Sequence, residues 1–197
     1  MNTHLESWFP KNRLETLTDS IYAVALTLLV LDLRVPPGAL DSTQFYEALR
    51  EQLPNALTWV LSFWVLIIYW ESQVRVSRYI EHINSIVLRL DLVHLGLITL
   101  LPFSTSLIGE HSSLSMAVVI YTANLWLISG IFCIKAAYIQ RNSQLVGHPD
   151  PSGLLRSAKL MFGGMTVALL LSTVAPGWNL LAILASKLLI NDKANVK

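Results

Sequence analysis

The residue types that carry out chemistry in enzymes are scattered through this chain. Its five histidines stand in loops and apolar segments without the close spacing of metal ligands, and no serine lies in a Gly-x-Ser-x-Gly turn. The single cysteine, Cys133, lies in an apolar run, so one chain can form neither a disulfide nor a thiolate metal site. The sequence therefore predicts a protein that is not an enzyme and has no cofactor and no fixed metal site.

A second group of reactive residues consists of ionisable side chains inside apolar segments. Such a group costs about 2.5 kcal/mol or more at the bilayer centre, so it needs a partner. In the third apolar segment Arg89 stands at the inner interface, and Asp91 and His94 lie one to two turns deeper. We expect structural polar contacts there, either a local pair of Arg89 with Asp91 or contacts to neighbouring helices, and a proton relay is the alternative. Arg13 and Asp19 are six positions apart, about 240° around a helix, so each is expected to find its partner on another helix.

The elements that hold these residues must lie in a membrane, because the composition is unsuited to a water-soluble globule. Of the 197 residues, 53% are hydrophobic and 14% are charged, whereas soluble domains carry roughly 25% charged residues. The formal net charge is only +1 and the basic residues are dispersed, so the chain lacks the basic patch that binds nucleic acid. The sequence predicts an integral membrane protein with no nucleic-acid partner.

Six apolar segments are long enough to cross the hydrocarbon layer, which takes about 20 residues of helix. Pro36 ends the first segment, and Pro54 suits the first turn of the second. The last two are joined only by Ala175-Pro176-Gly177 and are expected to be antiparallel neighbours. The fold class predicted is all-α, with one six-helix transmembrane domain over residues 1–197. The predicted spans are approximately 14–33, 54–70, 83–108, 114–135, 154–174 and 178–190.

Basic residues are concentrated on one side of these spans, the side that is cytoplasmic in membrane proteins. The opposite side has only Arg34 and Arg50, which acidic residues accompany. An even number of spans then places both termini in the cytoplasm. Trp70 falls near a predicted interface, where it is expected to act as a membrane anchor. The basic residues assigned to the cytoplasmic side are Lys11, Arg13, Arg75, Arg78, Lys135, Arg141, Arg156, Lys159, Lys187, Lys193 and Lys197.

The first span carries a stripe of small and medium-sized side chains on one helical face. Ser20, Val24, Thr27, Leu28 and Leu31 follow the spacing that brings residues to one side of a helix. The stripe is hydroxylated at its inner end and apolar farther out. Taken alone, such a stripe is typical of ordinary lipid-facing or core surface.

Two segments resemble signatures of the endosomal and lysosomal potassium channel family, transmembrane protein 175, and its bacterial relatives. Arg13 is followed at the family's spacing by Leu17-Thr18-Asp19, where the family has Phe-Ser-Asp, and then by Thr27-Leu28-Leu29-Val30-Leu31-Asp32. Leu101-Pro102-Phe103-Ser104-Thr105 resembles the Pro-Phe-x-Thr segment that ends the family's third helix. The order of the two signatures, the six spans and the chain length agree with the family.

The resemblance implies a homotetramer, surrounded by membrane lipid, in which the first helices line a central potassium pathway. Val24, Leu28 and Leu31 would form narrow hydrophobic layers of this pore. Thr27, together with Ser20, would supply the hydroxyl groups linked with selectivity. The pathway would hold permeant potassium ions only, and there would be no soluble substrate.

Residues behind the pore would tie the first helix to its neighbours. The resemblance assigns this network to Arg13, Thr18 and Asp19, and His82 is expected to join it. The expected location is the bacterial inner membrane, with several spans.

Two functions remain open on the residues themselves. The first is passive conduction of potassium, modestly preferred over sodium, because no Thr-Val-Gly-Tyr-Gly filter is present and an apolar ring can close a pore by dewetting. The alternative is a proton-coupled secondary transporter that uses Asp19, Asp91 or His94. The chain lacks the inverted repeat and the paired broken helices of many transporters, which favours the channel.

Overall fold

The computed structural model describes residues 9–34, 41–110, 115–142, 145–146 and 152–174, and nearly all of them are helical. Within these residues, the segments that are long and apolar enough to cross a membrane are five: Lys11–Asp32, Leu53–Ser77, Ser85–Gly109, Ser115–Arg141 and Gly153–Thr173. The all-α, multi-span class predicted from the sequence is confirmed. The sixth predicted span, 178–190, lies outside the described residues. In chain order the elements are α1 (Lys11–Leu28), η1 (Leu29–Asp32), α2 (Ser42–Glu51), α3 (Leu53–Ser77), α4 (Ser85–Thr99), α5 (Leu101–Glu110), α6 (Ser115–Arg141) and α7 (Ser152–Val174).

Several helix boundaries differ from the sequence-based ones for identifiable reasons. The segment expected to cross as one helix over 83–108 is divided at Leu100 into α4 and α5, because Pro102 has no N–H to continue the helical bonding. The α3 helix continues past Trp70 to Ser77, and α6 continues past Lys135 to Arg141. Lys135 is buried rather than interfacial, so it does not mark the end of its helix.

A short helix that is not among the predicted spans, α2, follows α1 and precedes α3 in the chain. Its N-terminus is a capping box: the Asp41 carboxylate accepts hydrogen bonds from the backbone N–H groups of Thr43 (2.7 Å) and Gln44 (2.9 Å). In return, the Gln44 side chain accepts one from the Asp41 N–H (3.3 Å). The first N–H groups of α2 are thereby satisfied.

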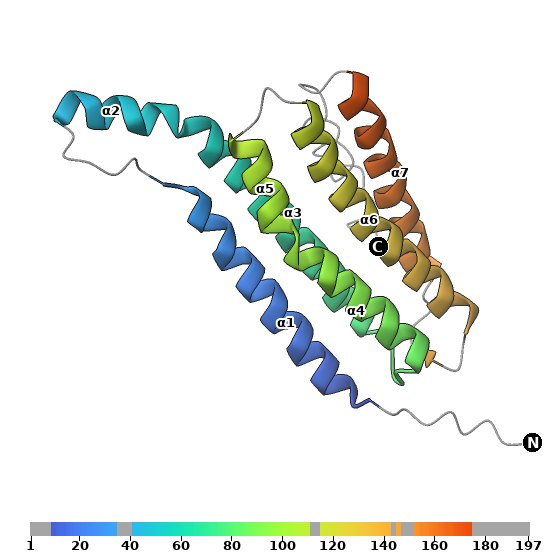
Figure 1. Ribbon diagram of the computed structural model, residues 1–197. Coiled ribbons are helices and arrows are strands. Elements are labelled where there is room, and N and C mark those ends of the chain that lie inside the picture. The colour runs from blue at the N-terminus through green and yellow to red at the C-terminus, as the bar shows by residue number, and fades with distance from the viewer. Residues whose placement is uncertain (1–8, 35–40, 111–114, 143–144, 147–151, 175–197) are drawn as a thin grey trace, which may run out of the picture.

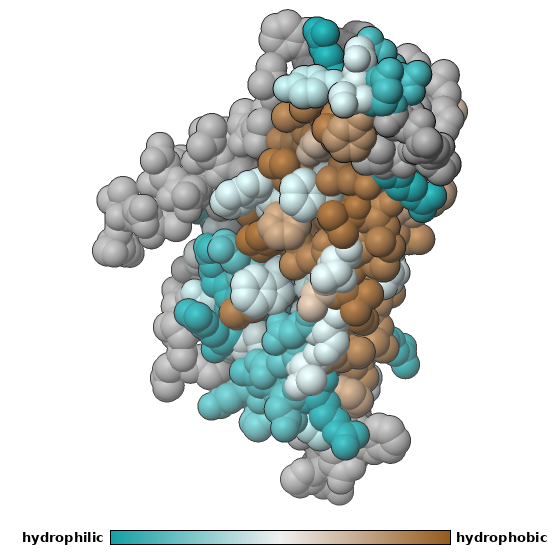
Figure 2. Space-filling view, turned by 90° about the vertical axis from the view of Figure 1, so that its left-hand side faces the viewer, coloured by the Kyte–Doolittle hydropathy of each residue, from teal (hydrophilic) through white to brown (hydrophobic). Residues whose placement is uncertain are grey.

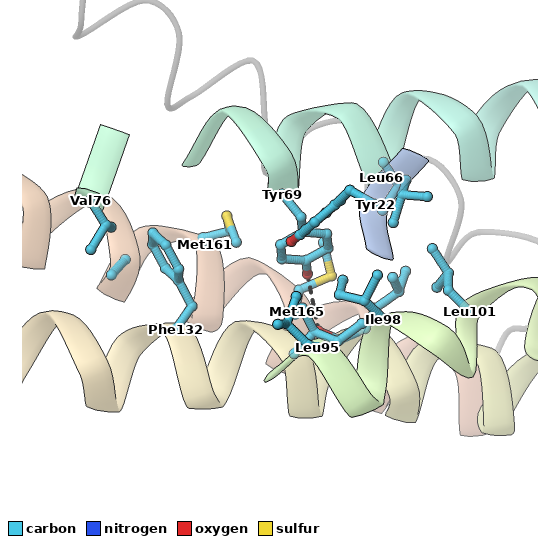
Figure 3. Close-up of a cluster of buried hydrophobic side chains, with 14 of the residues drawn as sticks. Tyr22, Leu66, Tyr69, Val76, Leu95, Ile98, Leu101, Phe132, Met161 and Met165 are labelled. Carbon is cyan, nitrogen blue, oxygen red and sulfur yellow. Dashed lines mark hydrogen bonds between the residues drawn. The ribbon is translucent and has the colours of Figure 1, made fainter. Parts of the chain in front are cut away.

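The helices form a bundle in which α1 lies at one edge and α6 with α7 at the other (Figure 1). Apolar residues from α1, α3, α4, α5, α6 and α7 meet between them in one core (Figure 3). Large, fully buried side chains include Tyr22 of α1, Leu66 and Tyr69 of α3, and Met165 of α7. The Tyr69 hydroxyl donates to the Leu125 carbonyl oxygen at 3.0 Å, so a polar group deep in the core is satisfied.

The two ends of the bundle differ in charge. The N-terminus of α1, the start of α4 and the end of α6 beside the start of α7 lie at one end, and α2 lies at the other (Figure 1). We call the first the basic end, since Lys11, Arg78, Arg141 and Arg156 belong to its helix termini. Figure 2, which views the side on which α1 lies, shows a hydrophilic region at the basic end, with an apolar region above it. The positions of the basic residues, rather than hydropathy, distinguish the two ends, as the sequence predicts.

Candidate pore-lining helix and the polar network behind it

The first helix presents two opposite faces. Glu15, Asp19 and Tyr22 follow the i, i+4, i+7 spacing and share one side. Val24 is nine positions after Glu15, which places it about 180° away around the helix. Contacts that hold the first face against the neighbouring helices therefore turn Val24 away from them.

Polar contacts from α3 and α4 hold this face, which is buried at Tyr22, half-buried at Glu15 and exposed at Asp19. The Ser77 hydroxyl donates to the Glu15 carboxylate. The Trp70 indole N–H donates to Asp19 Oδ1 at 2.8 Å. The Tyr22 hydroxyl and His94 Nε2 lie 2.8 Å apart in a hydrogen bond within the bundle. Directional contacts at successive turns determine the rotation of α1 about its axis.

The face opposite these contacts is exposed along its length. Val24 is 56% exposed, Leu28 42% and Leu31 58%, and Ser20 and Thr27 are exposed as well. Soluble proteins rarely leave a continuous apolar stripe uncovered. In this chain the stripe is available to lipid or to further copies of the protein.

The two hydroxyl groups on this face are oriented by their own helix. Thr27 Oγ1 donates its proton to the Val24 carbonyl oxygen at 2.8 Å, and Ser20 Oγ donates to the Thr16 carbonyl oxygen at 2.7 Å. A hydroxyl that donates in this way keeps its lone pairs as acceptors. Each oxygen can therefore accept a contact from a cation or a water molecule on the outer side.

The structure brings together only part of the network that the resemblance implied behind this helix. Asp19 does contact a neighbouring helix, and its partner is Trp70. Thr18 is half-buried and lines a cavity beside α1. Arg13 and His82 are exposed, and within the described part of the chain no hydrogen bond or ion pair joins either of them to Asp19.

A buried ion pair lies deeper in the bundle, near the basic end. The Lys135 ammonium of α6 contacts the Asp91 carboxylate of α4, and each residue is only 4% exposed. Gln73 of α3 bridges the two: its Oε1 accepts from Lys135 Nζ at 2.9 Å, and its Nε2 donates to Asp91 Oδ1 at 3.2 Å. Asp91 therefore pairs with a neighbouring helix, and Arg89, the alternative local partner, is exposed.

A cavity of about 230 Å³ separates α1 from this buried pair. Both charges of the pair line it, as do the half-buried Thr18 and the Asp19 carboxylate that holds α1. The space is large enough for several water molecules, each of which takes about 30 Å³ in the liquid. The lining residues are Lys11, Leu14, Glu15, Thr18, Asp19, Gln73, Val74, Ser77, Arg78, Ile80, Ile83, Asp91 and Lys135.

The second family-like segment also forms interhelical contacts. Thr105 Oγ1 of α5 donates to Ser62 Oγ of α3 at 3.0 Å, and Ser62 lies 3.1 Å from the Tyr121 hydroxyl of α6 in a further hydrogen bond. All three residues are buried. The threonine of the Pro-Phe-x-Thr-like segment thus links three helices rather than facing the candidate pore.

Across the residues that the structure describes, no group of three His, Cys, Asp or Glu side chains gathers in a way that could hold a metal ion. The polar groups found here instead position helices. The chemistry that the α1 face can offer is weak coordination by hydroxyl oxygens beside an apolar surface.

Comparisons with known proteins agree with the resemblance noted in the sequence. The model of the family described as endosomal/lysosomal potassium channel TMEM175 matches residues 13–102. A potassium channel of Streptomyces collinus is 32% identical over 103 residues, 50% of this chain and 48% of that protein. A potassium channel of a Chryseobacterium species is 31% identical over 99 residues, 50% of this chain and 49% of that protein. The chain thus spans about half the length of these curated relatives.

The fold is shared over a longer region. The crystal structure of a lysosomal potassium-selective channel TMEM175 homologue from Chamaesiphon minutus superposes with a TM-score of 0.83 at 19% identity, covering 94% of this chain and 98% of that one. At 19% identity, the similarity between the two structures shows a shared fold and nothing more. The chain is therefore similar in sequence to the TMEM175 family over residues 13–102, and in fold to a TMEM175 homologue over 94% of its length.

Proposed function

We propose that this protein is a passive potassium channel whose pore is lined by the exposed face of α1 from several copies of the chain. The observation that carries the proposal is this face, which is apolar and hydroxylated and is turned outward by the contacts of Glu15, Asp19 and Tyr22. Relatives matched over half of the chain are named potassium channels, which supports the same function.

Several copies are needed because one helix cannot enclose a pathway. Closed symmetry around a common axis converts one exposed stripe into a complete ring. We propose a homotetramer in the bacterial inner membrane, with the basic end and both termini in the cytoplasm. The charge difference between the two ends of the bundle supports this orientation.

The apolar part of the ring would act as the gate. Rings of Val24, Leu28 and Leu31 give a permeating ion nothing to replace its lost hydration water, so a narrow ring excludes both water and ions. Conduction then requires the rings to widen. Polar contacts of Glu15, Asp19 and Tyr22 join α1 to α3 and α4. A movement of α1 relative to these two helices would widen the rings.

The hydroxyl groups would favour potassium modestly over sodium. Thr27 and Ser20 keep acceptor lone pairs on the outer side of α1, and rings of such oxygens replace part of the ion's water shell. They are fewer and weaker ligands than stacked backbone carbonyls, so selectivity should be moderate.

Proton-coupled transport receives no support from the positions of the polar residues. Asp91 is neutralised by Lys135 and hydrogen-bonded by Gln73, and His94 is hydrogen-bonded to Tyr22. Both groups are engaged in holding helices together.

A flux assay with one pair of variants tests the channel. Purified protein in liposomes with a potassium gradient should pass potassium without any second ion gradient. Leu28→Asn should increase this flux, because a polar ring holds water in the constriction. The matched control is Leu92→Asn, since Leu92 of α4 is exposed to a similar degree (48%, against 42% for Leu28) and lies outside the proposed pore. Equal effects of the two substitutions would contradict the proposal.

A further inference from the structure

A second cavity lies at the basic end, on the side of the bundle away from α1. It is a cleft of about 450 Å³ between the last turn of α6 and the first turns of α7. Gln140 contributes from α6, and Arg156 and Lys159 contribute from α7 together with Leu155 and Leu160. Its volume falls within the range of roughly 300–1,000 Å³ that is typical of ligand sites.

The chemistry of this cleft is that of an anion site with an apolar border. Arg156 and Lys159 are three positions apart on one helix, so their side chains project to the same side. Both are exposed, as is the Gln140 amide, a further hydrogen-bond donor. None of the described residues that line the cleft is acidic. The cavity beside α1 differs in this respect, because Glu15, Asp19 and Asp91 line it.

The surroundings favour a lipid over a soluble anion. Both α6 and α7 are long and apolar enough to span a membrane, and the cleft lies at the ends of these spans, where headgroups lie. Leu160 is 41% exposed beside the two cations, which suits an acyl chain running along the helices below a headgroup. Basic pockets between membrane helices on the cytoplasmic side bind anionic lipid headgroups.

We propose that the cleft formed by Gln140, Leu155, Arg156, Lys159 and Leu160 binds the phosphate headgroup of an anionic phospholipid. The Arg156 guanidinium can hold two phosphate oxygens at once, and Lys159 adds a second positive charge. The lipid would bridge α6 and α7 and stabilise their pairing. This site is separate from the proposed pore and does not depend on ion conduction.

Thermal unfolding of the full-length protein in detergent tests the proposal, followed by the fluorescence of its six tryptophans. Short-chain phosphatidylglycerol should raise the Tm, whereas phosphatidylcholine with the same chains should not. The double variant R156Q/K159Q should need a roughly 30-fold higher phosphatidylglycerol concentration for the same shift, which corresponds to about 1 kcal/mol per cation. The charge-preserving variant R156K/K159R should retain most of the shift.

The matched control is R75Q/R89Q, which removes two exposed cations near the same end of the bundle but outside the cleft. This control should respond to phosphatidylglycerol as the unmodified protein does. An equal response of R156Q/K159Q and R75Q/R89Q would overturn the proposal. So would stabilisation by phosphatidylcholine to the same extent, or by inorganic phosphate alone, since the latter would indicate a site for a free anion. The Tm of each variant without lipid reports separately whether it folds.

Discussion

The Lys135 ammonium lies against the Asp91 carboxylate inside the bundle, and the two residues come from different spans, α6 and α4. Gln73 of α3 contacts both groups, so the pair and its bridge connect three helices. Two charges inside the bundle are tolerated because each neutralises the other and the Gln73 amide satisfies further hydrogen-bonding capacity. The pair determines how α3, α4 and α6 are aligned near the basic end.

Removing one charge of this pair should be strongly destabilising. Lys135→Met leaves the Asp91 carboxylate buried without its cation, and we expect a loss of about 3–5 kcal/mol in the free energy of unfolding. Asp91→Leu combined with Lys135→Met should recover most of this loss, since a well-packed apolar pair is often neutral or better. Denaturant unfolding in detergent measures both. Arg89→Gln, an exposed neighbour on α4, is the control, and a Lys135→Met variant as stable as that control would refute the role of the pair.

Removing the Trp70 hydrogen bond should affect conduction more than stability. Trp70→Phe keeps an aromatic ring but loses the N–H that Asp19 accepts. Both residues are exposed, so we expect at most about 1 kcal/mol of destabilisation. Because this contact helps to orient α1, potassium flux into liposomes should change markedly. Trp64→Phe, a more exposed tryptophan on the same helix, should leave flux unchanged, and identical behaviour of the two variants would argue against the orienting role.

Thr27 should contribute to the preference for potassium over sodium. Thr27→Val preserves the shape of the side chain and removes its oxygen. A loss of about 1 kcal/mol in ion preference would lower the permeability ratio roughly fivefold. The reversal potential in mixed potassium and sodium measures this ratio, and Thr27→Ser should preserve it. The control is Thr99→Val: Thr99 is exposed on α4 and donates to the Gly96 carbonyl oxygen at 2.7 Å, much as Thr27 does to Val24. An unchanged ratio in Thr27→Val would exclude Thr27 from selectivity.

Features that depend on local periodicity could be predicted from the sequence. The apolar length of the spans and the shared face of Val24 and Leu28 follow directly from helix geometry. The break before Pro102 and the capping box of Asp41 with Gln44 also have local signals. The apolar periodicity runs without interruption through 83–108 and therefore predicts one span, although Pro102 signals the break between α4 and α5.

Contacts between distant segments could not be predicted in this way. Lys135 resembled an interfacial lysine at a span end, and its partner Asp91 is 44 positions earlier. Trp70 resembles a membrane anchor in the sequence, because the second predicted span ends there, and only the packing of α3 against α1 brings it to Asp19. The partner of a charged residue inside a span depends on which helices pack against each other, and local sequence patterns do not give that packing.

Silver accessibility of a single cysteine is the most direct test of whether α1 lines the ion pathway. In a Cys133→Ala background, Val24→Cys places one thiol per chain on the exposed face of α1, and Leu92→Cys places one on the exposed face of α4. Silver is a monovalent cation that enters potassium pathways and binds thiolates. Potassium flux through Val24→Cys should be blocked by silver, and flux through Leu92→Cys should persist. Unaltered flux in Val24→Cys, with its thiol shown to be silver-bound, would contradict the pore assignment.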